Sequence, residues 1–141
     1  MAKDGGLSRI MQRLNAIPAR VKEAAAAAAI EGAEIIAADA RHFAQASKDS
    51  GDLIDSIEVT PAGQSTPEYS QPGGRTVVPE GAAMVTVGND QVRYPHLVEY
   101  GTKTADAQPY FWPAVDINKK KVASKMRRAL AKAAKESWGS K

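Results

Sequence analysis

Apolar and charged positions alternate with a helical period over the first long segment of the chain, between Pro18 and Ser47. Placed at 100° per residue, the small and apolar residues share one side and the charged residues share the other. The apolar side comprises Val21, Ala25, Ala28, Gly32, Ile35, Ile36 and Phe43. We therefore predict a long helix that ends at Ser47, and its small residues allow close approach of whatever packs against it.

Two residues depart from this pattern. Asp39 falls in the middle of the apolar side, and Ile30 falls in the middle of the polar side. A carboxylate among packed apolar groups needs a polar partner. We expect Asp39 to have a buried partner and Ile30 to contact a second subunit.

A shorter apolar stripe precedes this helix. Its members stand at helical spacing and are Leu7, Ile10, Met11, Leu14 and Ile17. These apolar side chains must pack against another surface, and two interpretations remain open. The segment either packs on its own domain or forms an N-terminal arm that docks on a neighbouring subunit.

The last part of the chain predicts a second long helix that begins at Pro113. Its apolar stripe consists of Val115, Val122, Met126, Ala129, Leu130 and Ala133. Much of the remaining surface is basic and is formed by Lys120, Lys121, Arg127, Arg128, Lys132 and Lys135. This helix should pack on one side and present cations on the others.

Between the two helices the pattern favours short strands. Residues 53–60 and 83–87 are predicted strands, residues 88–90 form a tight turn, and residues 91–94 begin a third strand. One face of a sheet this small must be buried against other elements, and the two long helices are available to cover it. The predicted fold class is therefore α+β, with a small antiparallel sheet packed against a long N-terminal helix and a C-terminal helix in a single domain spanning residues 1–141.

Residues 61–74 contain mostly Pro, Gly, Ser, Gln and Thr. So few apolar groups offset little of the cost of ordering a chain, which is about 1–2 kcal/mol per residue. We predict a flexible loop at about 61–81 that becomes ordered only on assembly.

Five of the eight aromatic residues lie between positions 94 and 112. Pro95 suits a first helical position, and Gly101 can adopt the left-handed conformation that ends a helix. Residues 95–100 are predicted to form a short helix; an edge strand over residues 92–100 is the alternative.

Composition limits the function. The chain has no cysteine, so disulfide and thiolate chemistry are excluded. The lack of cysteine suits folding in a reducing cytoplasm. Apolar runs are too short for a signal core or a membrane span, so we expect no membrane contact. Residues 113–141 carry seven lysines and two arginines against two acidic residues, a net charge of +7, whereas the rest of the chain carries −4. This asymmetry favours an acidic partner or self-association.

Catalytic patterns are weak. His96 with Glu99, and Asp39 with His42, have helical spacing, but a metal site needs four or more converging ligands. No glycine run matches a phosphate loop, and no serine stands in a nucleophile elbow. We predict no enzyme activity, no metal and no cofactor; Glu99 should instead act as a cap or pair with a basic group near Gly101.

Three motifs carry a resemblance. They are Ser50-Gly-x-Leu-x-x-Ser-Ile57, then Tyr94-x-His-x-Val-Glu-Tyr-Gly-Thr102, then Ala107-Gln-Pro-Tyr-x-x-Pro-Ala114. Together with their order between two helices, they resemble a family of tail-completion (neck) proteins of long-tailed bacteriophages.

The resemblance implies a structural virion protein, made in the cytoplasm of the bacterial host, in a ring that joins head and tail. The ring would contain six copies, contact the head-side connector and tail proteins, and let DNA pass without binding it specifically. The expected interface residues are Ile30, Tyr94, His96, Glu99, Tyr100, Tyr110, Trp112, Lys120, Lys121, Arg127, Arg128 and Lys132. The alternative is a nucleic-acid-binding protein that uses the basic C-terminal helix.

Overall fold

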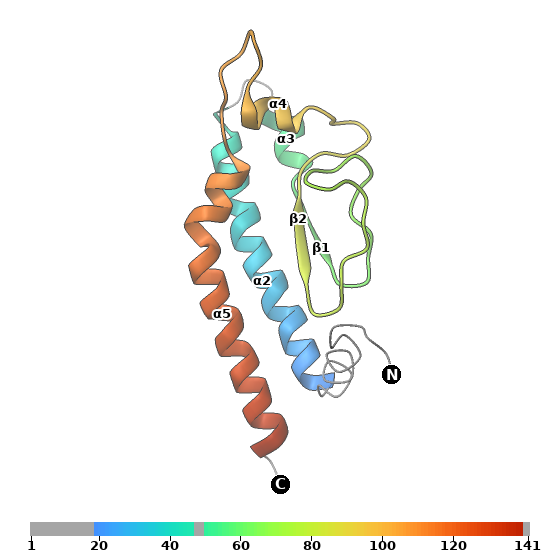
Figure 1. The fold of residues 1–141 in the computed structure, drawn as a ribbon, viewed down its shortest axis with the longest axis vertical. Coiled ribbons are helices and arrows are strands. Elements are labelled where there is room, and N and C mark those ends of the chain that lie inside the picture. The colour runs from blue at the N-terminus through green and yellow to red at the C-terminus, as the bar shows by residue number, and fades with distance from the viewer. Residues whose placement is uncertain (1–18, 47–49, 140–141) are drawn as a thin grey trace, which may run out of the picture.

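The computed structural model describes residues 19–46 and 50–139. Two long helices, α2 (Ala19–Ala44) and α5 (Phe111–Gly139), run antiparallel and side by side (Figure 1). A two-stranded antiparallel sheet of β1 (Glu58–Pro61) and β2 (Ala83–Thr86) packs on the other flank of α2. Short helices α3 (Ser50–Asp55) and α4 (Pro95–Tyr100) lie at the end where α5 begins. The predicted α+β fold is confirmed.

Close packing of α2 on α5 depends on small residues, as the sequence predicted. A Cβ atom built on Gly32 would lie 2.5 Å from Cγ1 of Val122 in α5, so any other residue here would force Val122 or the helices to shift. Alanines continue the contact toward the upper end of α2, where Ala37 and Ala40 are fully buried. The core there is completed by Leu53, Ile57, Val87, Tyr110, Phe111 and Ala114.

Asp39 has the polar partner that its position required. Its Oδ2 accepts a hydrogen bond of 2.7 Å from Nδ2 of Asn118 in α5, and Asn118 also donates to the carbonyl of Ala114 at 2.8 Å. This polar pair joins the two long helices within their packed surface. Ile30 is half-buried on α2, and its predicted contact with a second subunit stays a prediction.

The predicted strand over residues 53–60 is wrong in its first half. Residues up to Asp55 form α3, and only Glu58 to Pro61 pair with β2. The buried residues Leu53, Ser56 and Ile57 stand at helical spacing, a pattern that a short segment shares with an alternating strand. The Ser56 hydroxyl donates to the carbonyl of Leu53 at 2.7 Å and accepts from the N–H of Gly88 at 3.0 Å, which ties α3 to the end of β2.

The third strand, predicted over residues 91–94, is also wrong, since the described chain has a sheet of two strands. The side chain of Asn89 accepts hydrogen bonds from the N–H groups of Gln91 and Val92, both at 2.9 Å. These donors are therefore unavailable to a strand ladder. The chain turns here into α4, whose predicted range is confirmed against the alternative of an edge strand.

The observed boundaries of the two long helices differ from the predicted ones by a few residues. The first ends at Ala44 instead of Ser47, and the last begins at Phe111 instead of Pro113. Proline is tolerated within a first helical turn because no intrahelical acceptor faces its nitrogen there. The start at Phe111 brings Phe111 and Trp112 into the helix itself.

The long polar segment folds back on the sheet. Ser65 pairs with Val77, and Gln71 pairs with Val87 just beyond β2. Thr66 is buried, and its hydroxyl accepts from the N–H of Thr76 at 2.8 Å. Hydrogen bonds thus replace the apolar contacts that the sequence lacks. The mobility of residues 61–81 in a free subunit stays a prediction.

Candidate assembly interface

A buried carboxylate organises the cluster of aromatic residues. Glu99 in α4 is 6% exposed, and its carboxylate faces the first turn of α5. Oε1 accepts from the N–H of Tyr110 at 3.2 Å and of Phe111 at 2.8 Å, while Oε2 accepts from the N–H of Trp112 at 3.4 Å. Glu99 therefore caps α5, as the sequence suggested, although it was expected to act beside Gly101.

This arrangement accounts for every free backbone donor at the start of α5. An α-helix leaves its first four N–H groups without an intrahelical acceptor. In α5 these belong to residues 110–113, counted from the helix start at Phe111. Glu99 accepts three of them, and Pro113 has no N–H to satisfy. The negative charge also lies at the positive end of the helix dipole.

The cap explains why two of the sequence motifs belong together. One supplies the glutamate through Val98-Glu99-Tyr100-Gly101, and the other supplies the proline three residues after Tyr110. Joined through the cap, these two motifs hold α4 at a fixed place on α5.

Tyr110 completes the buried part of the cluster. It is 1% exposed, and its hydroxyl donates to the carbonyl of Pro95 at 3.2 Å. Burial, with a smaller effect from the nearby Glu99, raises the pKa of the Tyr110 phenol well above its usual range. Tyr110 therefore remains a neutral hydrogen-bond donor that links the start of α4 to the start of α5.

Two other aromatic residues form the outer surface of this cluster. Trp112 Nε1 donates to the Tyr100 hydroxyl at 2.8 Å, although Tyr100 is 67% exposed and Trp112 is 40% exposed. The Trp112 ring also packs edge-on against Phe111, with centroids 5.1 Å apart. Exposed aromatic side chains held in one orientation are typical of protein contact surfaces.

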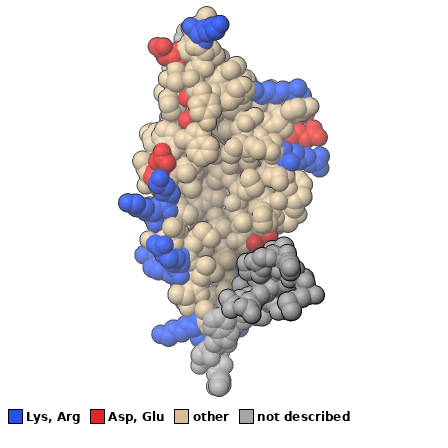
Figure 2. Space-filling model, viewed as in Figure 1, with Lys and Arg blue, Asp and Glu red and all other residues tan. Residues whose placement is uncertain are grey.

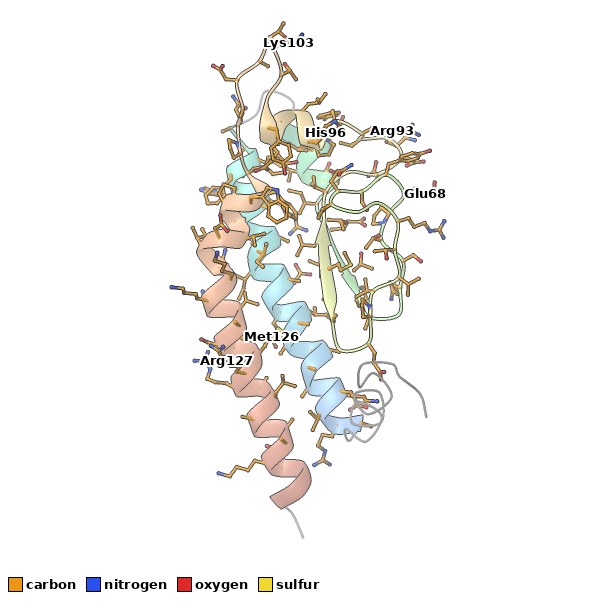
Figure 3. The ribbon with its side chains drawn as sticks, in the orientation of Figure 1. Glu68, Arg93, His96, Lys103, Met126 and Arg127 are labelled. Carbon is orange, nitrogen blue, oxygen red and sulfur yellow. The ribbon has the colours of Figure 1, made fainter. Side chains whose placement is uncertain are left out.

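A loop of residues 101–109 joins α4 to α5 and projects beyond the body of the protein, with Lys103 at its tip (Figure 3). Its base is fixed by hydrogen bonds from Gly101 N to Leu97 O at 2.9 Å and from Gln108 N to Val98 O at 2.8 Å. Gly101 has φ 77° and ψ 175°. The predicted positive φ is confirmed, but this ψ lies outside the left-handed helical region, so that part of the prediction is wrong.

The twelve predicted interface residues fall into three groups. Glu99 and Tyr110 are buried and hold the cluster together, while Ile30 and Tyr94 are half-buried. The exposed members are His96, Tyr100, Trp112, Lys120, Lys121, Arg127, Arg128 and Lys132. Lysine and arginine side chains gather along the α5 edge (Figure 2). Contact with another subunit stays a prediction for the whole set.

Sequence reasoning missed the connection between the polar loop and the segment before α4. The guanidinium of Arg93 lies 3.8 Å from the centroid of the Tyr69 ring. Tyr69 is the non-glycine residue with a positive φ, 61°, in the described chain, and it is 52% exposed. The lone aromatic in a polar segment was a usable signal, but its partner 24 positions along the chain was not visible in the pattern.

The described residues offer little for metal or membrane chemistry. They contain no group of three or more metal-ligating side chains. Among the helices described, none is long and apolar enough to cross a bilayer.

Comparison with known families identifies the class of protein. Residues 8–101 match the family model described as "Bacteriophage HK97-gp10, putative tail-component". Because the match covers about two-thirds of the chain, the protein belongs to this family of phage tail components, which confirms the predicted resemblance. The match includes α4 with Glu99 and ends at Gly101. No curated protein and no solved structure matches the chain significantly.

Proposed function

We propose that this protein is a subunit of the ring that joins head and tail in a long-tailed phage. The observation that carries the proposal is the family match to a tail component over residues 8–101. The exposed Tyr100 and Trp112, oriented by a capped helix, support a role in protein contact. The protein has no catalytic role in this account, and its place is in the virion.

The ring would be a hexamer that meets the head-side connector on one face and tail proteins on the other. DNA would pass along its axis without specific binding. The projecting loop of residues 101–109, with the end of α4 and the start of α5 that it joins, forms a distinct end of the subunit that would suit one of these contacts. The domain would act as one unit in which residues 61–81 become fully ordered on assembly.

The basic surface of α5 is proposed to contact acidic protein surface. Ion pairs of α5 within the described chain join Lys119 to Asp116 at 3.5 Å and Lys125 to Glu31 at 3.1 Å. The five cations predicted to act at the interface are different residues, and all are exposed. DNA that moves along a channel must not be held, whereas several phosphate contacts would hold it.

Replacing Lys120, Lys121, Arg127, Arg128 and Lys132 with glutamine should weaken self-association about tenfold or more, because exposed ion pairs contribute about 0.2–1 kcal/mol each. The melting temperature should change little. Mass photometry over a concentration series measures the effect. The variant Arg20→Gln, which removes an exposed cation at the start of α2, is a control that should assemble normally.

The same variant separates the proposal from the nucleic-acid alternative, which the row of exposed cations on α5 favours. Duplex DNA binding is measured at physiological salt for the wild-type protein and the glutamine variant. Tight binding by the wild type, lost in the variant while oligomers persist, would contradict the proposed role and support nucleic-acid binding.

A further inference from the structure

An open apolar groove runs along the front of the molecule between α5 and β2, with α2 as its floor. Its volume is about 460 Å³, and none of the residues that line it is charged. Six of its larger apolar side chains are only half-buried: Ile36, Met84, Val85, Val115, Val122 and Met126. In Figure 2 this central surface is free of lysine, arginine, aspartate and glutamate. Apolar surface gathered in this way is typical of a docking site.

The chain itself contains a segment of matching character. Residues 7–17 carry five apolar side chains at helical spacing, and these residues precede the described part of α2. As a helix, the segment would be about 15 Å long. The stretch of α5 that lines the groove, from Phe111 to Met126, is about 22 Å long on the same geometry. The segment is therefore short enough to lie within the groove, and its polarity matches.

As a helix folded back beside α2, a subunit's own arm would not fill its own groove. The groove floor begins at Ala29, which is ten residues up α2 from Ala19. Suppose that residues 7–17 formed a helix running antiparallel beside α2. Each residue from Ile17 toward Leu7 would then lie level with a position one residue further along α2. Only Leu7 would then reach the level of Ala29. The remaining four apolar side chains would lie below the groove.

The surface that a subunit's own arm would meet is also unsuitable. The hollow beside Ala19 is lined by the charged residues Lys22, Glu23 and Glu80, together with alanines and a glycine. Lys22 and Glu80 form an ion pair of 3.7 Å across it. An apolar stripe placed there would desolvate charges without gaining apolar contact.

We propose that residues 7–17 of one copy dock as a helix in the apolar groove of a neighbouring copy. The inference rests on the self-association in the proposed function and names how adjacent subunits are joined. Within a ring, each arm is held close to the next groove, so its effective concentration is high and a modest intrinsic affinity suffices. The exchange of arms covers both apolar surfaces, and the arm's Arg9 and Arg13 remain on its other faces.

The absence of cysteine from the chain allows a direct cross-linking test. One full-length chain carries Met11→Cys at the middle of the arm, and a second chain of different mass carries Val122→Cys at the middle of the groove. Because both positions are central, either direction of docking brings them together. After mixing and treatment with a short thiol-to-thiol cross-linker, we expect a mixed dimer as the main product. Ala131→Cys, on the exposed side of the same helix, is the matched control and should give little product with Met11→Cys.

Three results would overturn the inference. A chain with both Met11→Cys and Val122→Cys that yields mainly an internally cross-linked monomer would place the arm in its own groove. Oligomers that form without the mixed dimer would show that another element or another protein fills the groove, and the proposed ring would stand. A chain that forms no oligomer at any concentration would contradict both the arm exchange and the proposed self-association.

Discussion

Replacing Glu99 with alanine should lower the free energy of unfolding by about 3 kcal/mol, since three N–H groups at the start of α5 lose a charged, buried acceptor. For a domain of this size that corresponds to a fall in melting temperature of about 10 °C. Thermal unfolding followed by circular dichroism measures it. The loss should be large because α5 is held to α4 through this carboxylate.

Two variants show whether the cap is the cause. Glu99→Gln keeps one side-chain oxygen as an acceptor but removes the charge, so its loss should be intermediate. Asp106→Ala removes an exposed carboxylate from the adjacent loop and should change stability by less than about 0.5 kcal/mol. A melting temperature for Glu99→Ala equal to that of Asp106→Ala would show that the cap does not stabilise the fold.

Gly101→Val should lower the free energy of unfolding by about 3 kcal/mol or more, for two separate reasons. With φ 77° and ψ 175°, Gly101 adopts a conformation that is essentially confined to glycine, and other residues are strained there by about 1–3 kcal/mol. In addition, a Cβ atom would lie 2.7 Å from the nitrogen of Ala107 and 3.1 Å from the oxygen of Ala105. Both are backbone atoms, so the loop between α4 and α5 would have to move.

Gly63→Val is the matched control. Gly63 also has a positive φ, 83°, but no atom lies within 4 Å of its built Cβ. Gly63→Val therefore tests the backbone strain without the close contact. Its loss in free energy of unfolding, measured by chemical denaturation, should be smaller than that of Gly101→Val by about 1–3 kcal/mol. Equal losses at the two glycines would mean that the loop does not approach Gly101 closely.

Local patterns in the sequence were sufficient for the two long helices and for α4. Each has a clear apolar period or a strong end signal, as with Pro95 and Gly101. They failed over residues 53–55, because the spacing of Leu53, Ser56 and Ile57 fits a helix while the alternation that follows fits a strand. In segments this short, the local pattern does not decide the element, and packing does.

The contacts that position the site depend on residues far apart in the chain. Sequence reasoning showed that Asp39 needed a partner, but Asn118 lies 79 positions away and could not be identified from periodicity. The same holds for Ser56, whose hydroxyl accepts from Gly88 across the sheet. Glu99 was correctly predicted as a cap, but the identity of the helix that it caps, α5, was not predicted, because only the folded chain brings α4 against the start of α5.

The proposed role of this protein in joining heads to tails is tested most directly by electron microscopy of lysates from the phage that carries the gene, after the gene is inactivated. If the protein has this role, the lysates should contain DNA-filled heads and separate tails, with joined particles restored when the wild-type protein is supplied. Intact, joined virions in the absence of the protein would contradict it.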